Sequence, residues 1–272
     1  MAGALTTYRQ KEVGIGFLIN RYPEFSAFKG ARISLGYISG IERNTKWSYC
    51  ENGVHKKYIE DLQTMFIGQT GYGKSTLLNS ILGEDVFKTD DINSCTKELQ
   101  NALFWLDDEK KTYLSLNDLP GIGESEVADA GYMKWYKGML EKSSCIVYVL
   151  NADKRSHTPD FSVFKELFTG NRMQSRVIIA LTCADKVGNN RGEGITSEQL
   201  EILNRKVDEV RRLFGDLPII PCSGKTGWNV DKLVGVMVGM LKRDIIIPNQ
   251  YSSDLSESIN KISETMENLF RW

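Results

Sequence analysis

The sequence predicts an α/β fold in which a mostly parallel sheet carries helices on both faces. Continuous apolar strands at residues 145–150 and 177–181 alternate with helical patterns, such as the one at 161–168. Strands that are apolar along their whole length are buried on both faces, which is typical of parallel sheets. In addition, a glycine-rich turn joins a short apolar strand at 64–67 to a helix at 76–82.

The composition is that of an ordinary globular protein, with 41% hydrophobic and 25% charged residues. A net charge of -1 argues against nucleic acid as an obligatory partner of the whole chain. No run approaches the roughly 18 apolar residues of a transmembrane helix, and the first nine residues lack the apolar stretch of a secretory signal. The five cysteines lack C-x-x-C spacing, so we expect a cytoplasmic protein with unpaired thiols.

Residues 1–60 precede the glycine-rich turn, and we interpret them as an N-terminal extension. They are rich in aromatic residues and carry more basic than acidic side chains, a composition that suits contact with a membrane surface or RNA. We favour the alternative that they pack on the domain that follows. The turn Glu51-Asn52-Gly53 predicts a hairpin between 47–49 and the chain from Val54 onward.

Residues 68–75 fit the pattern G-x-x-x-x-G-K-[ST] between a strand and a helix. Glycines at 68, 71 and 73 let the backbone turn tightly and aim successive N–H groups inward, which makes an anion site at the helix N-terminus. Lys74 can reach the terminal phosphates of a nucleotide, and the Ser75 hydroxyl can ligate Mg²⁺. The predicted nucleotide contacts here are Gly68, Gln69, Thr70, Gly71, Tyr72, Gly73, Lys74, Ser75 and Thr76.

A polar loop at 83–98 follows this helix, and its position suits a mobile switch. The Thr96 hydroxyl can complete a Mg²⁺ shell when a γ-phosphate is present, and the alternative is a plain surface threonine. Residues 103–106 and 112–116 then predict two antiparallel strands, which give the sheet one antiparallel edge strand.

The stretch Asp118-Leu119-Pro120-Gly121 comes directly after this strand pair. An aspartate at the carboxyl end of a strand can hold Mg²⁺ through water, and the Gly121 N–H can point toward a γ-phosphate. We therefore expect a second switch loop at 118–131.

Two further polar stretches follow the strands at 177–181 and 218–222, where the carboxyl ends of parallel strands form ligand sites. The carboxylate of Asp185 can accept both N1–H and the 2-amino group of guanine, an arrangement that adenine lacks. The candidate ligand-binding residues at these strand ends are Thr182, Cys183, Asp185, Lys186, Ser223, Gly224 and Lys225.

Helices are predicted at about 196–214 and 230–243, and the tail carries a single apolar stripe. The stripe needs a partner, for which we favour residues 1–60 over a homodimer or another protein. The chain thus divides into an N-terminal extension (1–60), a central domain (61–245) and a C-terminal amphipathic helix (246–272). The stripe consists of Leu255, Ile259, Ile262, Met266 and Leu269.

Five motifs in this order resemble those of the translation-factor-related GTPases, most closely the Era, septin and immunity-associated branches, with bacterial prophage-type relatives included. The resemblance covers about residues 62 to 243. It implies a three-layer P-loop NTPase fold (G domain) that binds GTP or GDP with Mg²⁺ and acts as a slow, partner- or dimer-stimulated switch. By the same resemblance, Lys74, Thr96 and Gly121 are catalytic, and Ser75, Thr96 and Asp118 hold the metal.

Two positions depart from the family pattern. Cys183 stands where the family has a lysine that packs on the base, which leaves an ATPase as an open alternative. Ile122 stands where Ras-like members carry the glutamine that positions water, so positioning must come from a second subunit, from Arg155, or from Gln69 and Tyr72.

Two further questions stay open in the sequence. We expect His157 to be a solvated loop histidine, with water positioning as the alternative. The second functional class is a nucleotide-dependent assembly or membrane-associated scaffold with little turnover, of the septin or immunity-associated type.

Overall fold

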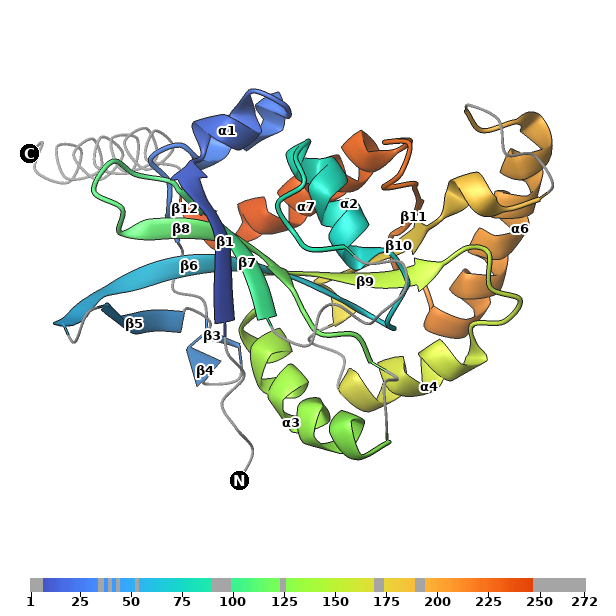
Figure 1. Cartoon of the computed structure of the whole chain (residues 1–272), viewed down its shortest axis with the longest axis horizontal. Coiled ribbons are helices and arrows are strands. Elements are labelled where there is room, and N and C mark those ends of the chain that lie inside the picture. The colour runs from blue at the N-terminus through green and yellow to red at the C-terminus, as the bar shows by residue number, and fades with distance from the viewer. Residues whose placement is uncertain are drawn as a thin grey trace, which may run out of the picture.

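The computed structural model describes residues 7–33, 37–38, 41–42, 45–51, 54–89, 99–122, 126–168, 174–188 and 194–246. Its main feature is a twisted sheet with helices above and below it (Figure 1). The strand order is β1 (Thr7–Gly14), β7 (Leu99–Trp105), β8 (Thr112–Asp118), β6 (Val54–Gly68), β9 (Cys145–Asn151), β10 (Val177–Thr182) and β11 (Ile219–Pro221), and β5 (Thr45–Glu51) pairs with β6.

The predicted mostly parallel sheet is confirmed: β8, β6, β9, β10 and β11 run parallel to one another, and β7 is antiparallel to β8. The expectation that the antiparallel strand lies at the edge of the sheet is wrong, because β1 pairs with β7 on its outer side. The carboxyl ends of the five parallel strands therefore meet at one edge of the sheet. The hairpin of β5 and β6 is also confirmed, and β6 extends well before the expected start at residue 64 because its first half pairs with β5 and β8.

The helices form one layer on each face of the sheet (Figure 1). One hydrophobic cluster joins the sheet to α1, α2 and α7, and a second cluster joins the other face to α3, α4 and α6. This confirms the three-layer arrangement. The helices are α1 (Gly16–Ile19), α2 (Lys74–Leu82), α3 (Glu126–Lys142), α4 (Thr158–Leu167), α6 (Ser197–Phe214) and α7 (Val230–Leu241), with 3₁₀ turns η1 (Pro23–Phe28), η2 (Ala184–Lys186) and η3 (Lys242–Asp244).

Strand β1 adds to the sheet outside β7 and runs parallel to it, which the sequence did not predict. A register shift between Arg9 and Lys11, together with the ion pair of Arg9 and Glu12, marks this edge strand. Bulges and charged residues on an edge strand oppose pairing with another chain.

The segment that follows β1 packs on the α2 and α7 face. Leu18, Phe25 and Phe28 are fully buried there. Arg21 donates from Nε to the carbonyl oxygen of Ile81 (3.2 Å) and from Nη2 to that of Ser80 (3.3 Å). Because these are carbonyls of the last turn of α2, the guanidinium caps that helix.

Helix α6 begins with the capping chemistry expected near Thr196. The Thr196 side chain accepts from the Gln199 backbone N–H (3.3 Å), and Gln199 Oε1 accepts from the Thr196 backbone N–H (3.0 Å). Thr196 and Gln199 therefore form a capping box.

The chain after α7 forms β12 (Ile245–Ile246), which pairs antiparallel with β2 (Arg32–Ile33); β3 (Tyr37–Ile38) pairs with β4 (Ile41–Glu42). The C-terminal amphipathic helix expected at 246–272 lies outside the described part of the chain except for Ile246, which belongs to β12. Among the described helices, none combines the length and the apolar character needed to cross a membrane.

A buried polar cluster lies where β6 and β8 pair. Asp61 is 8% exposed and its Oδ2 accepts from Ser115 Oγ (2.9 Å), while Asn117 Nδ2 donates to the same Ser115 Oγ (2.9 Å). Burial raises the pKa of Asp61 to about 7, against the opposing influence of Ser115 and Gln63.

This cluster makes stability depend on pH. Because the pKa of Asp61 is higher in the folded chain than its ordinary value of 3.8, the folded state holds its proton longer, and stability is lost as pH rises from about 4 to about 7. We expect Asp61→Asn, which keeps an acceptor for Ser115, to raise the free energy of unfolding at pH 8 by roughly 2 to 4 kcal/mol but little at pH 4. Urea unfolding across pH 4 to 8 measures this difference.

The exposed Asp216 provides the control, since Asp216→Asn changes the net charge equally. If Asp61→Asn changes the free energy of unfolding by the same amount at pH 4 and at pH 8, the pH dependence does not come from Asp61.

Candidate functional site

The glycine-rich turn forms a loop between β6 and α2. Gly71 (φ 78°) and Gly73 (φ 82°) adopt the left-handed conformation that favours glycine. Lys74, the first residue of α2, is 5% exposed, and its Nζ donates to the carbonyl oxygens of Gly68 (3.1 Å) and Gln69 (3.0 Å). A lysine ammonium thus lies within a loop at a helix N-terminus, where both the backbone N–H groups and the charge favour an anion.

Ser75 and Asp118 lie together beside this loop. Ser75 Oγ donates to Asp118 Oδ2 (2.5 Å), and Asp118 is fully buried at the carboxyl end of β8. Burial raises the pKa of Asp118 to about 6, although Lys74 and Ser75 both oppose the shift. Asp118 Oδ1 is buried and has no hydrogen-bond partner among the described residues. A hydroxyl and a carboxylate side by side are oxygen ligands of the kind that Mg²⁺ takes, so these residues fit that ion.

The chain after Asp118 runs directly against the loop. The Thr70 N–H donates to the Ile122 carbonyl oxygen (3.3 Å), and the Ile122 N–H donates to that of Gly68 (3.2 Å). A Cβ on Gly121 would lie 2.0 Å from Thr70 Oγ1 and 2.7 Å from the Thr70 backbone nitrogen. Only glycine fits at this close approach, which places the Gly121 backbone at the mouth of the loop.

The stretch after β10 is tied to the same loop. Thr182 Oγ1, in a side chain that is 2% exposed, contacts the carbonyl oxygens of Tyr72 (2.7 Å) and Leu150 (2.9 Å). Cys183 follows in the left-handed conformation (φ 57°), and burial raises the pKa of its thiol. Gln199 Nε2 donates to the Asp185 carbonyl oxygen (3.2 Å), so α6 holds the turn η2.

The stretch after β11 completes the site. The Ala184 N–H donates to the Cys222 carbonyl oxygen (3.2 Å), which joins the two stretches that follow β10 and β11. A Cβ on Gly224 would lie 2.9 Å from the Leu77 backbone nitrogen, so this loop lies directly on the first turn of α2. An open cavity of about 540 Å³ has Thr76, Gly224 and Lys225 among its lining residues.

The structure therefore brings most of the expected site residues into one region. Four segments that are far apart in the sequence, the loop at 68–75 and the stretches after β8, β10 and β11, meet there through direct contacts. Thr96 falls in residues 90–98, outside the described part of the chain. The residues that lie together are Gly68, Gln69, Thr70, Gly71, Tyr72, Gly73, Lys74, Ser75, Thr76, Asp118, Gly121, Thr182, Cys183, Asp185, Lys186, Ser223, Gly224 and Lys225.

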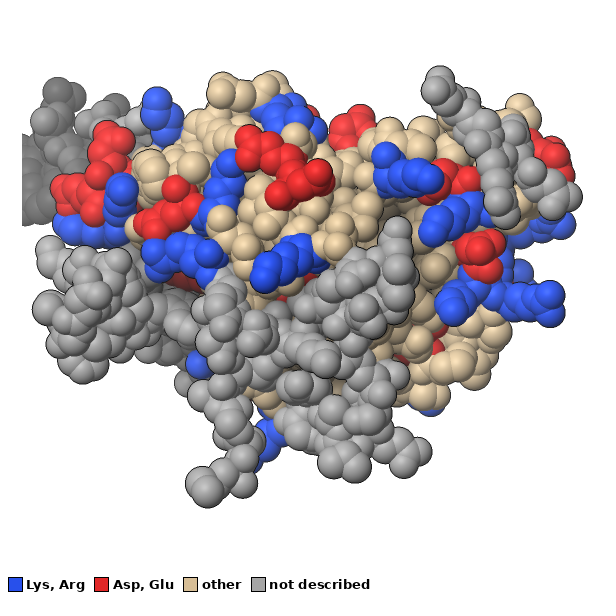
Figure 2. All heavy atoms as spheres, viewed as in Figure 1, with Lys and Arg blue, Asp and Glu red and all other residues tan. Residues whose placement is uncertain are grey.

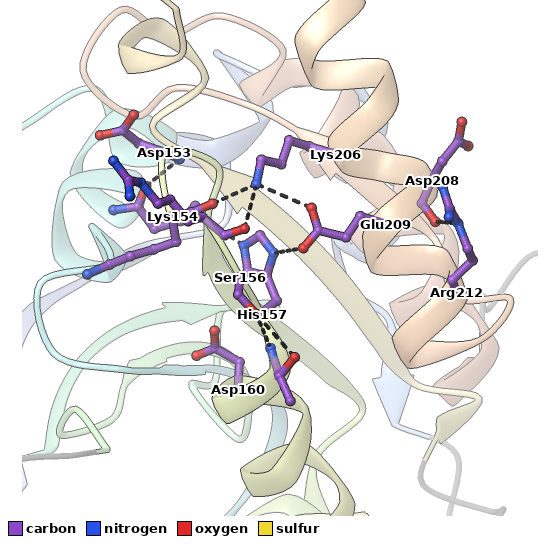
Figure 3. Close-up of polar contacts among 12 residues, drawn as sticks. Asp153, Lys154, Ser156, His157, Asp160, Lys206, Asp208, Glu209 and Arg212 are labelled. Carbon is purple, nitrogen blue, oxygen red and sulfur yellow. Dashed lines mark hydrogen bonds and ion pairs between the residues drawn. The ribbon is translucent and has the colours of Figure 1, made fainter.

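One expectation is wrong. His157 is not a solvated loop histidine: its side chain is fully buried, and Nε2 lies 3.1 Å from the Asn151 carbonyl oxygen. It is enclosed because the loop between β9 and α4 packs against α6, where Glu209 Oε1 lies 3.8 Å from Nδ1 (Figure 3). Arg155 of the same loop is exposed.

The sequence also missed a polar group behind the loop. Tyr72 is 5% exposed and its hydroxyl donates to Asp160 Oδ2 (3.4 Å), a carboxylate on α4 that is 1% exposed. Asp160 belongs to none of the sequence motifs, and no local pattern marks it. An aspartate near the start of a helix is ordinarily explained by the helix dipole.

The family described as 50S ribosome-binding GTPase matches residues 63–183 of the chain. Among curated proteins, the uncharacterized protein YkfA of Escherichia coli K12 is 27% identical over 184 residues, which are 67% of this chain and 63% of YkfA. The probable GTP-binding protein EngB of Kosmotoga olearia is 24% identical, with 65% of this chain and 87% of EngB covered. The matched region thus spans less than two thirds of YkfA.

Among solved structures, Era of Aquifex aeolicus, determined with GDP·AlF4⁻, superposes with a TM-score of 0.54 at 23% identity. The superposition covers 66% of this chain and 56% of the Era chain. At this identity the similarity concerns the fold. It agrees with the sheet and with the helix layers described above.

The contact between Thr182 and the loop yields a prediction about stability. Thr182→Val keeps the shape of the side chain but removes the hydroxyl, whose single proton is donated to the carbonyl oxygen of Tyr72 or to that of Leu150. We expect a loss of about 1 to 3 kcal/mol in the free energy of unfolding, measured by urea denaturation. Thr182→Ser keeps the hydroxyl and should lose less, so equal losses in the two variants would argue against a role for the hydroxyl.

Proposed function

We propose that the chain contains a P-loop GTPase domain of the translation-factor-related class, and that it binds GTP with Mg²⁺ and hydrolyses it to GDP and phosphate as a slow switch. The observation that carries the proposal is the hydrogen bond between Thr182 Oγ1 and the Tyr72 carbonyl oxygen. It joins the proposed base site to the proposed phosphate site, so that one ligand can reach both.

The phosphates would lie in the loop at 68–75. Lys74 and the backbone N–H groups neutralise and orient them, and the N-terminus of α2 adds its dipole. Ser75 and Asp118, together with Thr96, would hold Mg²⁺, which supplies further charge neutralisation at the γ-phosphate. The Gly121 N–H would meet the γ-phosphate, because this residue lies against Thr70 of the loop.

The base would lie between the stretches that follow β10 and β11. Asp185 accepts from guanine, Thr182 fixes the start of the turn, and the backbone of Ser223, Gly224 and Lys225 meets the opposite edge of the base. Cys183 presents a smaller side chain than lysine to the base, and Lys186 is exposed on the same turn. Recognition by the Asp185 carboxylate would favour guanine over adenine. It would thereby exclude the ATPase alternative.

Hydrolysis should be slow without an activating surface, on the order of 10⁻⁴ to 10⁻² s⁻¹. Ile122 is 4% exposed and its backbone is bonded to Gly68 and Thr70, so it offers no group to an attacking water. Tyr72 is no longer a candidate for water positioning because its hydroxyl donates to Asp160. Gln69, the exposed Arg155 or a second subunit remain as sources of the missing group.

The switch loops at 83–98 and 118–131 would report the γ-phosphate to a partner protein or to a second copy of the chain. Contact with RNA or a membrane through residues 1–60 is less favoured, because Arg9 pairs with Glu12 and Lys11 with Glu84 in the described part of this segment. Basic and acidic side chains are also interspersed over the described part of the face in Figure 2. The cysteine usage favours a cytoplasmic location.

No contact among the described residues specifically favours the scaffold alternative. The path of seven strands ends in the charged, bulged strand β1 on one side and in β11, three residues long, on the other, and β5 pairs with β6 alone among the described strands. The edges formed by β1 and β11 oppose assembly by strand pairing. Gel filtration with GDP and with a non-hydrolysable GTP analogue separates the two functions, because nucleotide-dependent polymerisation would favour the scaffold.

Nucleotide binding and turnover test the proposal directly. We expect the chain to bind GTP and GDP in preference to ATP, to need Mg²⁺ for turnover, and to release phosphate slowly. Lys74→Ala removes the buried ammonium and should abolish nucleotide binding, measured by titration with a fluorescent GDP analogue. Lys232→Ala on the exposed side of α7 is the matched control. If Lys74→Ala still binds GTP, the proposed phosphate site is wrong.

The base site has its own test. Asp185→Asn replaces an acceptor by a donor opposite N1–H and the 2-amino group, so we expect GTP affinity to fall at least about tenfold and xanthosine triphosphate affinity to rise. Competition titrations with the two nucleotides measure the change. An unaltered GTP preference would count against Asp185, and a preference for ATP in the unchanged chain would replace the guanine assignment.

A further inference from the structure

We propose that Asp160, which lies outside all five sequence motifs, is a positioning residue that holds the phosphate loop through the hydroxyl of Tyr72 and thereby slows nucleotide release. The inference rests on the proposed function, since it assumes that the loop at 68–75 binds the phosphates. It concerns a different property of the site, namely how rigidly the loop is held.

Tyr72 is fixed at several points. Its side chain is 5% exposed, whereas its neighbours Thr70 and Gly71 are exposed. Its hydroxyl donates to Asp160 Oδ2 (3.4 Å), its carbonyl oxygen contacts Thr182 Oγ1 (2.7 Å), and its N–H donates to the Gln69 carbonyl oxygen (3.3 Å). One residue therefore fastens the middle of the loop to α4, to the end of β10 and to the start of the loop itself.

Asp160 is an unusual residue at its position. It lies in the first turn of α4 with 1% exposure, and its Oδ1 is buried without a hydrogen-bond partner in the described part of the chain. Burying a carboxyl is unfavourable unless it gains partners, and an apolar side chain would pack there at lower free-energy cost. Burial also raises the pKa of Asp160, while the nearby His157 and the Tyr72 hydroxyl oppose the shift. The hydrogen bond to Tyr72 gives this carboxyl a role that packing does not.

The loop between β9 and α4, which leads to Asp160, contacts α6 (Figure 3). His157 is fully buried; since a carbonyl oxygen only accepts, its Nε2–H donates to the Asn151 carbonyl oxygen (3.1 Å). Its Nδ1 faces Glu209 Oε1 at 3.8 Å. Lys206 Nζ donates to Glu209 Oε2 (3.2 Å) and to the Lys154 carbonyl oxygen (2.7 Å). These contacts hold the chain that leads into α4, and with it the position of the Asp160 carboxyl.

A phosphate loop binds tightly only while its N–H groups stay aimed at the phosphates. The bond to Asp160 restrains the loop at Tyr72, next to Gly71 and Gly73, whose backbones are the least restricted. Its loss should therefore leave the loop intact but looser, and nucleotide should leave faster.

A double-mutant cycle tests the coupling on the full chain loaded with a fluorescent GDP analogue. We expect Tyr72→Phe and Asp160→Ala each to speed release about three- to tenfold, and the double variant to be no faster than the faster single variant. Asp160→Asn keeps an acceptor for the Tyr72 hydroxyl, so it should stay within about twofold of the unchanged chain.

Tyr113→Phe is the matched control. The Tyr113 hydroxyl, in a side chain that is also 5% exposed, donates to Glu12 Oε1 (3.2 Å) near the start of β8, so this variant removes the same group from a contact with a carboxylate at the end of β8 opposite to Asp118. It should lower Tm while leaving the release rate unchanged. If Asp160 served stability alone, every variant that lowers Tm, the control included, would release nucleotide faster.

The outcomes separate this inference from the proposed function. Single variants that release nucleotide at the original rate, or a double variant whose effect is the product of the two, would overturn the positioning role while nucleotide binding stands. If Asp160→Ala does not fold, Tyr72→Phe decides alone, since it removes a single oxygen. An unchanged chain that binds no guanine nucleotide would overturn both.

Discussion

The hydrogen bond from Thr182 Oγ1 to the Tyr72 carbonyl oxygen is the contact on which the site depends. It joins the end of β10 to the loop after β6, although the strands β6 and β10 are separated in the sheet by β9. The contact exists because parallel strands end at a common edge, where the chain segments after them must share the same space. The approach of Gly224 to α2 and of Gly121 to Thr70 follows from the same crowding, which only glycine tolerates at these points.

The rest of the molecule maintains that edge. The parallel core is covered on both faces by helices, and β1 with the segment to Phe28 extends the sheet and caps the end of α2 through Arg21. The N-terminal segment thus contacts the elements that precede and follow residues 90–98 in the sequence. Arg21 contacts the end of α2, and β1 pairs with β7.

Several buried polar groups in the structure lower stability rather than raise it. Burial raises the pKa of Asp61, Asp118 and Asp160, and a raised pKa means that the charged form is disfavoured in the fold. Asp118 and Asp160 both lie against the phosphate loop, where a carboxylate can hold a metal or a neighbouring side chain. Destabilised groups of this kind gather at functional sites because function, not packing, requires them there.

The sequence by itself determined the α/β class, the antiparallel strand pair, the phosphate loop and the positions of Ser75, Asp118, Thr182 and Asp185. These features depend on neighbours in the chain: apolar periodicity, glycine spacing and the residues at strand ends. Only the tertiary structure decided that β1 pairs with β7, that His157 is buried and that Tyr72 contacts Asp160. These depend on pairs far apart in the sequence, such as the 88 residues between Tyr72 and Asp160. Such pairs leave no local pattern, because their side chains meet only once the sheet and its helices have brought them together.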